Sequence, residues 1–485
     1  MILYFNLTSF TLWTLCFLLL SGFCKDINGQ TTSDYERLQP YNENPYYWQY
    51  KGKPILLIAG SDYHNIFQRP DLVEHLDLLK SIGGNYIRNT MASREIFADH
   101  RDLWPFEAVE ATEDSLINIY DLAKWNDAYW ENFEKMLVET VARDMIVEVT
   151  IWERHDFYRT RDQAGWIRQP YNPANNINYT ADESGLPDDD SVTDPGHPFF
   201  ATVPELNHNE VVLPYQKAFV DKILSYTFEY NHVMYNMNNE TREPNEWGEY
   251  WAGYILSKAD ERGIQIELTD MQDAHNVTDE SVARMMDSDV FTFVDISQNN
   301  FQTGDLHWER IQYIRNYLKD NPKPITNIKV YGSDYISPAE FWGTSQDGIE
   351  RFWRNLLGGS SSARFHRPDW GTGLSKVAQT HIRSAAMFAE KMDIFNSRPA
   401  NDLFVTRTPG SAFMMANPGR LYAVYFPDGG EAEIVLEGNA RFVQVQWLDI
   451  ESSWWGGGGT SQTEETLTIS PPGEGHWIGI VTLIQ

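Results

Sequence analysis

The sequence predicts an α/β protein in which a (β/α)8 barrel is followed by a small antiparallel β-sandwich. Short apolar strands alternate with amphipathic helical segments from about residue 54 to residue 395, giving eight strand–helix units. After about residue 398 the pattern changes to short alternating strands separated by glycine and proline turns. Parallel strands joined by helices form a barrel, whereas closely spaced alternating strands form a sandwich.

The barrel strands are expected where short apolar and β-branched runs end at polar turns. They fall at 55–60, 85–89, 146–152, 232–240, 264–270, 290–297, 325–331 and 362–366. Between them, segments such as "DLVEHLDLLKSIG" place apolar residues three or four positions apart, which is typical of helices that cover a sheet. An open doubly wound sheet is the alternative, but no glycine-rich phosphate-binding motif follows an early strand.

We divide the chain into a signal peptide (1–29), the barrel (30–397) and the C-terminal β-sandwich (398–485). The first 23 residues are apolar and uncharged, and the polar sequence that follows is typical of a secretory signal. Cleavage near Gly29 would release a secreted or periplasmic protein. Lipidation of Cys24 is the less favoured alternative, because Phe23 stands where lipoprotein signals carry a small residue. In the sandwich, the run GGGG at 456–459 is expected to be a hairpin or loop.

Composition narrows the class of partner. The net charge of −31 argues against nucleic acid and anionic membranes. Aromatic residues make up 14% of the chain, including 17 tryptophans, and such rings stack on sugars. Both cysteines lie in the N-terminal segment, so no disulfide is expected in the folded part. The sequence has no zinc or P-loop motif, and we predict no cofactor, no metal and no membrane span.

Barrel enzymes carry their chemistry at the carboxyl ends of the strands, and this rule selects the candidate residues. Four types of side chain gather at those ends: carboxylates, cations, proton-transferring rings and aromatic or amide groups. The candidates, in chain order, are His64, Arg88, Trp152, Arg154, His155, Asn239, Glu240, Lys329, Tyr331, Arg364, His366 and Arg367.

The segments "YDLAKWNDAYWENFEKMLVETVARDMIVEVTIWE", "NPANNIN", "HVMYNMNNE" and "EWGEYWAGYI" resemble the barrel glycoside hydrolases of the large retaining clan. The resemblance is nearest to the apiosidase-like group, and the tail "YFPDGGEAEIVLEG…VQWLDIESSWW" is similar to its C-terminal β-sandwich of the collagen-binding type. It implies that Asn239 and Glu240 match the Asn-Glu pair at the end of strand four. In that clan the glutamate is the general acid/base.

The resemblance fails at strand seven, where the clan has its nucleophilic glutamate. The matching position falls on or beside Lys329, in "TNIKVYG". Retaining hydrolysis needs a second carboxylate about 5 Å from the first, and an ammonium group cannot form the glycosyl ester. Either Asp334, Glu153 or Asp270 has taken that role, or the reaction is no longer retaining hydrolysis.

A lysine at this place suits a substrate that brings its own carboxylate. In a uronic acid, a cation near the carboxylate stabilises the charge that develops when the C5 proton is removed. We therefore predict an enzyme of polysaccharide breakdown that acts on uronate-containing, sulfated or ulvan-type oligosaccharides by β-elimination, as a dehydratase or lyase. Glu240 would protonate the leaving oxygen. Lys329 would neutralise the uronate or act as base, and His64, His155, His366 or Tyr331 would relay the proton.

Substrate binding is assigned to Arg88, Asn239, Arg154, Trp152, Arg364 and Arg367. Two alternatives stay open: a glycoside hydrolase with Glu240 as general acid, and a sugar-binding protein without catalytic activity.

Overall fold

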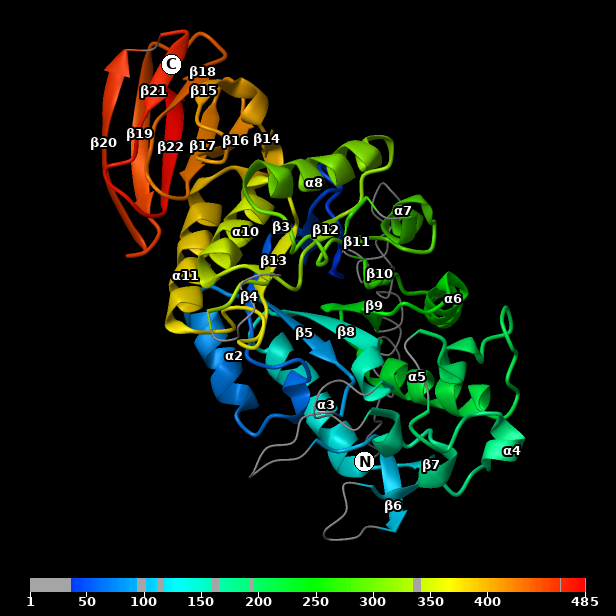
Figure 1. Ribbon diagram of the computed structural model, residues 1–485. Helices are drawn as coiled ribbons and strands as arrows, with labels where there is room; N and C mark the ends of the chain where they lie inside the picture. The colour runs from blue at the N-terminus through cyan, green and yellow to red at the C-terminus, as the bar shows by residue number, and fades with distance from the viewer. Residues whose placement is uncertain are drawn as a thin grey trace, which may run out of the picture.

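The computed structural model describes residues 36–93, 102–110, 117–158, 165–191, 195–274, 276–278, 280–334, 342–462 and 464–484. The predicted signal peptide lies outside the described residues. The strands of the C-terminal part form a separate block beside the helix-and-strand part of the chain (Figure 1).

Eight strands of the described chain form the barrel and confirm the predicted (β/α)8 architecture. Parallel pairing joins β5, β8, β9 and β10 in order, β11 to β12, and β13 to β4. The strands are β4 (Leu57–Gly60), β5 (Tyr86–Thr90), β8 (Ile146–Glu153), β9 (Val233–Asn239), β10 (Leu268–Thr269), β11 (Val294–Asp295), β12 (Ile325–Thr326) and β13 (Ser362–Phe365). Each one lies in or overlaps a predicted segment.

Hydrogen bonds outside this regular pairing connect the remaining neighbours. The side chain of Asn85 accepts from the backbone of β4 and so links it to β5. Between β10 and β11, the amide of Thr292 donates to the carbonyl of Leu268 (2.9 Å), and between β12 and β13 the amide of Ser361 donates to the carbonyl of Ile325 (2.7 Å). The eight strands therefore close into a ring.

A long helix follows each barrel strand and covers the outside of the ring (Figure 1). These helices are α2 (Leu72–Ser81), α3 (Asp127–Val141), α5 (Leu213–Thr227), α6 (Asn245–Arg262), α7 (Glu280–Asp287), α8 (Gly304–Tyr317), α10 (Ser345–Leu357) and α11 (Lys376–Lys391). Their apolar residues recur at helical spacing; α3, for example, buries Tyr129, Trp130, Phe133 and Leu137 on one face.

Smaller elements close the amino end of the barrel and build its loops. The antiparallel strands β1 (Gln39–Pro40), β2 (Trp48–Tyr50) and β3 (Lys53–Ile55) bring Trp48 edge-on to Phe293, with ring centroids 5.2 Å apart. Trp48 belongs to the cluster that also holds the first residues of several barrel strands, so the amino end is filled with apolar side chains. A hairpin of β6 (Phe106–Glu110) and β7 (Ile119–Trp125) precedes α3.

The loops also carry short helices. These are α4 (Ala181–Ser184), η1 (Ile66–Gln68), η2 (Arg154–Asp156), η3 (Gly165–Arg168), η4 (Pro173–Asn175), η5 (Pro198–Ala201), η6 (Leu318–Asp320), η7 (Ile394–Asn396) and η8 (Asn401–Leu403).

The C-terminal strands form two antiparallel sheets, as predicted. One has the order β14-β16-β17-β22-β19-β20 and the other the order β15-β18-β21, counted over the described residues. Their bounds are β14 (Arg398–Pro399), β15 (Phe404–Arg407), β16 (Phe413–Asn417), β17 (Leu421–Phe426), β18 (Ala432–Val435), β19 (Phe442–Asp449), β20 (Trp454–Gln462), β21 (Thr466–Ile469) and β22 (Trp477–Ile484).

One local prediction for the sandwich is wrong. The glycine run 456–459 is not a hairpin or loop but lies inside the edge strand β20, paired with β19. A register shift between Val445 and Trp447 accommodates it, with Gly457 and Gly458 at φ 65° and 104°. The glycines thus form a β-bulge, which needs positive φ values, rather than a turn between strands.

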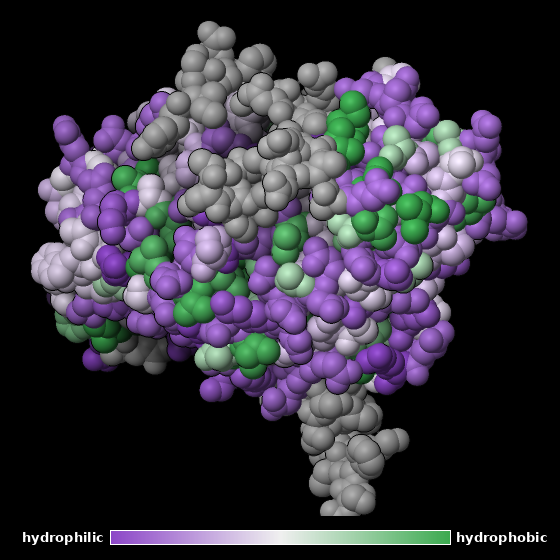
Figure 2. Space-filling model, turned by 90° about the horizontal axis from the view of Figure 1, so that it is seen from below, coloured by the Kyte–Doolittle hydropathy of each residue, from purple (hydrophilic) through white to green (hydrophobic). Residues whose placement is uncertain are grey.

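The surface fits the strongly acidic composition. Figure 2 shows one face of the molecule, on which hydrophilic residues dominate and apolar residues form small scattered groups. Among the described residues, no helix combines the length and apolarity that a membrane span requires.

Candidate active site

Glu240 stands at the centre of the candidate site and has an unusual backbone. It comes directly after β9, and its φ of 53° lies in the left-handed region, which a non-glycine residue seldom adopts. Arg154 holds this conformation by donating from Nη1 to the carbonyl of Glu240 (2.5 Å). Strained backbone of this kind costs about 1–3 kcal/mol and concentrates at functional sites.

Four side chains converge on the carboxylate of Glu240. On Oε1, Lys329 Nζ lies at 2.7 Å, the Tyr331 hydroxyl donates at 2.9 Å, and Gln298 Nε2 donates at 3.2 Å. On the other oxygen, Oε2, His155 Nε2 lies at 3.4 Å. Together with Glu240, these residues follow four different barrel strands. The closed ring thus brings together groups that are up to 176 positions apart in the sequence.

The ion pair sets the protonation of both partners. Burial alone would raise the pKa of Glu240, but the Lys329 ammonium and then His155 lower it, and the net pKa is well below its usual value. For Lys329 burial is the larger effect, and it lowers the pKa to about 8 although Glu240 opposes the change. At neutral pH, therefore, Glu240 is an anion and Lys329 a cation. Glu240 as it stands is not a proton donor.

Asn239 ties this pair to the rest of the barrel mouth. Its Oδ1 accepts from Lys329 Nζ and from Arg88 Nη2 (2.8 Å), and its Nδ2 donates to Glu153 Oε1 (2.5 Å). Arg88 also contacts His64 Nδ1 through Nη1 (3.2 Å). The Asn239 amide thus joins two cations and a carboxylate. All of the side chains in this network are buried.

Two histidines and a tyrosine form a row of tilted rings beside the ion pair. The ring of His366 lies 4.8 Å from that of His64 and 4.7 Å from that of Tyr331, measured between centroids. Burial, reinforced by Lys329, places the pKa of His366 well below its usual value, so this imidazole is neutral. Burial and then Glu240 raise the pKa of Tyr331 well above its usual value, which keeps its phenol protonated.

The other predicted arginines reach the site to different degrees. Arg154 pairs with Asp273 (2.9 Å) besides holding the Glu240 carbonyl. Arg364 is fully buried and donates to the carbonyl of Ile328 (2.8 Å), so it supports the barrel wall. Arg367 pairs with Asp369 (2.7 Å), keeps a side-chain exposure of 18%, and influences the pKa of Tyr331 and of His366. Arg367 is therefore the most accessible of these cations.

Trp152 does not join the cluster, although it was predicted to bind substrate. Its indole packs against Phe219, Trp247 and Trp251, with ring centroids 5.3–5.5 Å apart, on the helix side of the sheet. The regular alternation of β8 breaks after Thr150, which still faces Arg88 in the barrel, so that Trp152 points outward and Glu153 inward.

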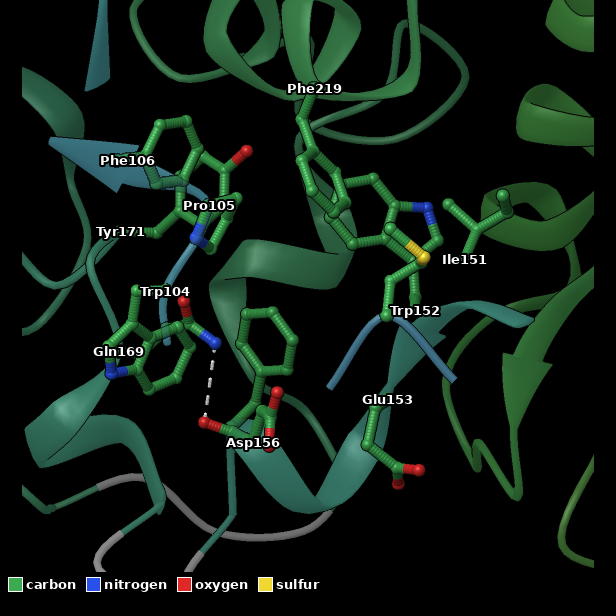
Figure 3. A pocket seen from close by; sticks show the side chains of 12 residues that line it. Trp104, Pro105, Phe106, Ile151, Trp152, Glu153, Asp156, Gln169, Tyr171 and Phe219 are labelled. Atoms are coloured by element: carbon green, nitrogen blue, oxygen red, sulfur yellow. Dashed lines mark hydrogen bonds between the residues drawn. The ribbon is translucent and has the colours of Figure 1, made fainter. Parts of the chain in front are cut away.

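A small cavity adjoins Trp152 (Figure 3). It has a volume of about 30 Å3, which holds about two water molecules and is too small for a sugar ring. Its lining includes Trp104, Phe106 and Tyr171, and Gln169 donates to the carbonyl of Asp156 across it (3.4 Å). Trp152 therefore belongs to the core rather than to the substrate surface.

Of the three acids considered for the missing second carboxylate, only Glu153 belongs to the network around Glu240. Asp270 is buried and satisfied by Arg284 (2.8 Å) and Asn238 (2.6 Å), which makes it structural. Asp334 is exposed and accepts from the amide of Ser345 (3.1 Å) at the start of α10. A hydrolytic reaction would thus depend on Glu153.

Two buried carboxylates inside the barrel escaped the sequence reasoning. Glu148 accepts from the Tyr86 hydroxyl (2.6 Å) and from Asn236 (3.0 Å), and burial raises its pKa. Burial and then Glu148 raise the pKa of Asp295 to about 7. The signal was present as a single acid within each of the apolar runs "IVEVTIW" and "VFTFVDIS". No group of three metal-binding side chains occurs within the described part of the chain.

Comparison with solved structures shows that the chain has a known fold. One match, described as a glycoside hydrolase, has a TM-score of 0.61 at 10% identity over 93% of this chain and 98% of the other. A glycoside hydrolase family 5 protein from Bacteroides vulgatus ATCC 8482 has a TM-score of 0.62 at 11% identity, covering 93% and 94% of the two chains. A second protein from the same organism gives 0.63 at 11% identity, covering 94% and 84%.

The chain has the fold of the glycoside hydrolase barrels. At this identity the likeness concerns the fold alone. No family model matches the sequence, and neither does any curated protein. The apiosidase-like resemblance and the type of the C-terminal sandwich therefore remain predictions.

Proposed function

We propose that the protein is a carbohydrate-active enzyme that removes water or a sugar from uronate-containing oligosaccharides by β-elimination. One observation carries the proposal: a lysine and a tyrosine both bond to the same carboxylate oxygen of Glu240. This arrangement supplies a cation, a base and a protonated donor side by side. Retaining hydrolysis instead needs a protonated acid and a free carboxylate.

The reaction would begin with an exchange of partners. Lys329 is only 1% exposed and Glu240 is 14% exposed, so a ligand meets Glu240 first. A substrate carboxylate that enters beside Glu240 competes for the ammonium, with Arg367 as a second cation nearby. Once Lys329 turns to the substrate, the main cause of the low pKa of Glu240 is removed, and its carboxylate becomes a stronger base.

The proton that Glu240 takes up is returned to Tyr331 through one hydrogen bond, so both residues end the reaction in their starting states. Glu240 takes the C5 proton, the electrons form the C4=C5 double bond, and the C4–O bond breaks. Tyr331 gives its phenolic proton to the leaving oxygen, as hydroxide or sugar alkoxide. Protonated Glu240 returns a proton to the Tyr331 phenolate across their 2.9 Å hydrogen bond. Glu240 is thus the base here, and Tyr331 takes the donor role that the sequence analysis gave to Glu240.

The cations of the site indicate the class of substrate. Lys329 and Arg367 favour a uronate at the reacting ring, and a sulfated or ulvan-type chain is the candidate that we carry forward from the sequence. His155 is 17% exposed and contacts Glu240 Oε2, so it lies where a ligand can reach it.

Hydrolysis is the second candidate, because the fold is that of glycoside hydrolases and Glu153 belongs to the Asn239 network. The two reactions are separated by incubating the protein with a uronate-terminated oligosaccharide in 18O-water. Elimination gives the ultraviolet absorbance of the unsaturated uronate and no 18O in the product. Incorporation of 18O without absorbance would refute elimination and support hydrolysis. Glu240→Gln should abolish the absorbance change, whereas the matched Asp334→Asn at the exposed loop should retain it.

A further inference from the structure

The end of the C-terminal sandwich carries a row of side chains that the barrel chemistry does not use. Asp449 of β19 lies opposite Trp454 of β20 on one side and opposite Trp477 of β22 on the other. Residues that are directly paired across strands point to the same face of a sheet. Since neighbouring strands lie about 4.8 Å apart, the two tryptophans stand about 10 Å apart with the carboxylate between them.

Trp454 is the most exposed aromatic side chain of the described chain, at 60%. Its ring lies against Gly456, because a Cβ atom built on that glycine would lie 1.5 Å from ring atom Cζ3. A Cβ on Gly458 would lie 2.0 Å from the carbonyl oxygen of Val445, whereas one on Gly457 would have no neighbour nearer than 3.6 Å and one on Gly459 none within 4 Å. The glycine bulge in β20 therefore leaves an open floor beside an exposed indole.

The second indole is fixed in place. Trp477 donates from Nε1 to the carbonyl of Glu474 (2.9 Å) and packs edge-on against Trp447, with ring centroids 6.4 Å apart at 88°. Pro472 lies near Gly457 and borders the same floor. The surface is thus lined by two aromatic rings and a proline, at the end of the sheet where β19, β20 and β22 lie side by side (Figure 1).

The polar groups of this surface are acceptors. Asp449 Oδ1 accepts from the amides of Glu451 and Ser452 (3.1 and 3.3 Å), which fixes the carboxylate in the turn before Trp454. The carboxylate of Glu451 lies beside Gly475 in the neighbouring loop. Acceptors between aromatic rings complement a ring that has C–H faces and hydroxyl donors. Negative charge at the same place repels uronate and sulfate groups.

We propose that the face formed by Trp454, Asp449 and Trp477 binds an uncharged stretch of polysaccharide. The indoles stack on two sugar rings of one chain, and Asp449 accepts hydrogen bonds from hydroxyls between them. Binding here does not depend on the reaction in the barrel. It would hold a neutral part of a chain by the sandwich while Lys329 and Arg367 in the barrel take an acidic part.

Affinity electrophoresis of the full chain tests this site. Gels contain hydroxyethylcellulose, xyloglucan or galactomannan as neutral probes, or polygalacturonate as the anionic one. Migration of the wild type should be retarded by at least one neutral probe. Trp454→Ala should weaken that retardation about tenfold or more, as for an exposed aromatic anchor. Phe442→Ala is the matched control, because Phe442 is 43% exposed at the opposite end of β19 and should leave retardation unchanged.

A second variant moves the ring without removing it. Gly456→Ala places a methyl group where the Trp454 ring now lies, and should reduce retardation while the melting temperature stays near that of the wild type. Four results would overturn the proposal. They are no retardation by any neutral probe, retardation that survives Trp454→Ala, Trp454-dependent retardation by polygalacturonate alone, and a dimer on gel filtration that Trp454→Ala dissociates.

Discussion

The ion pair between Lys329 and Glu240 should make a large and pH-dependent contribution to stability. Lys329→Met keeps the length of the side chain but leaves Glu240 ionised beside Asn239 without its cation. Removing one partner of a buried pair costs about 3–5 kcal/mol. We expect the lower end, about 3 kcal/mol at pH 7, because the substitution also relieves the burial of an ammonium group whose pKa has fallen to about 8.

The sign of the pH dependence follows from Glu240. Its folded-state pKa is lowered, so the stability that it contributes is fully present above its ordinary pKa of 4.5 and is lost as the pH falls through the folded value. The free energies of unfolding of wild type and Lys329→Met should therefore converge below pH 4.5. At higher pH the gap should stay open until Lys329 itself loses its proton.

The assay is urea denaturation at a series of pH values, with a matched lysine as control. Lys323 is also buried, but its Nζ donates to the carbonyls of Ser288 (2.6 Å) and Phe291 (2.8 Å). Lys323→Met should destabilise the protein by an amount that does not change as the pH falls from 7 to well below 4.5. The reasoning would be refuted if Lys329→Met were equally insensitive to pH, or if it stabilised the protein at pH 7.

Three further predictions concern the reaction. Tyr331→Phe removes the donor to the leaving oxygen and should lower kcat about 10²–10⁴-fold with little change in KM, as seen in steady-state kinetics. Activity should fall above about pH 8 as Lys329 deprotonates, and Lys329→Arg should move that alkaline limb upward in a pH–rate profile while lowering kcat. Glu153→Gln should reduce elimination less than about tenfold, since Glu153 contacts Asn239 and the amide of His155 rather than the carboxylate of Glu240. Loss of all activity in a mass-spectrometric assay would favour hydrolysis.

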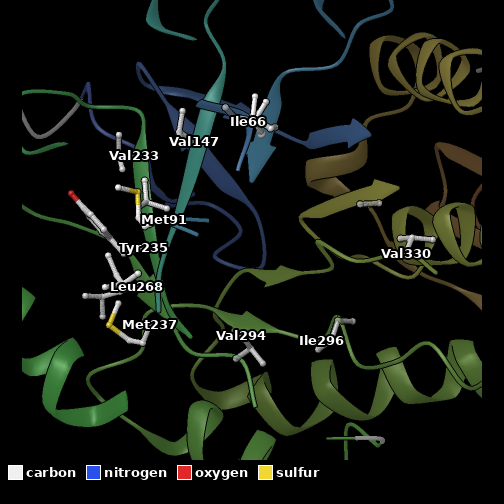
Figure 4. Packing of buried hydrophobic residues seen from close by; sticks show 14 of the residues in the cluster. Ile66, Met91, Val147, Val233, Tyr235, Met237, Leu268, Val294, Ile296 and Val330 are labelled. Carbon is white, nitrogen blue, oxygen red and sulfur yellow. The ribbon is translucent and has the colours of Figure 1, made fainter. Parts of the chain in front are cut away.

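The fold could be predicted because periodicity reports burial directly. Val147, Val233 and Tyr235 alternate with inward residues and belong to the core cluster under the helices, and Figure 4 shows Tyr235 beside Leu268 of the next strand. The shortness of β10, β11 and β12 could not be read in this way, because an apolar run shows burial and not which backbone groups pair.

The site was only partly predictable, for two physical reasons. The rule that strand ends carry function selected Glu240, Lys329 and Tyr331, and the structure brings the last two into contact with Glu240. It misplaced Trp152, because a break in strand alternation is not visible in a sequence. It also gave Glu240 the role of acid, because the pKa of a carboxylate depends on the distance to a cation that lies 89 positions further along the chain. That distance exists only in the fold.

In the proposed elimination, Lys329, which follows β12, would link the charge of the substrate to catalysis. A glycosidase must keep one carboxyl group protonated, yet Lys329 at 2.7 Å keeps Glu240 ionised. A neutral glycoside has no anionic group that competes with Glu240 for the Lys329 ammonium. Glu240 then stays ionised, so it is a weak base and cannot donate a proton. A uronate competes for Lys329, and only then does the pKa of Glu240 rise. Selection for an acidic substrate therefore comes from the activation of the base and not from binding alone, and it should be expressed in kcat more than in KM.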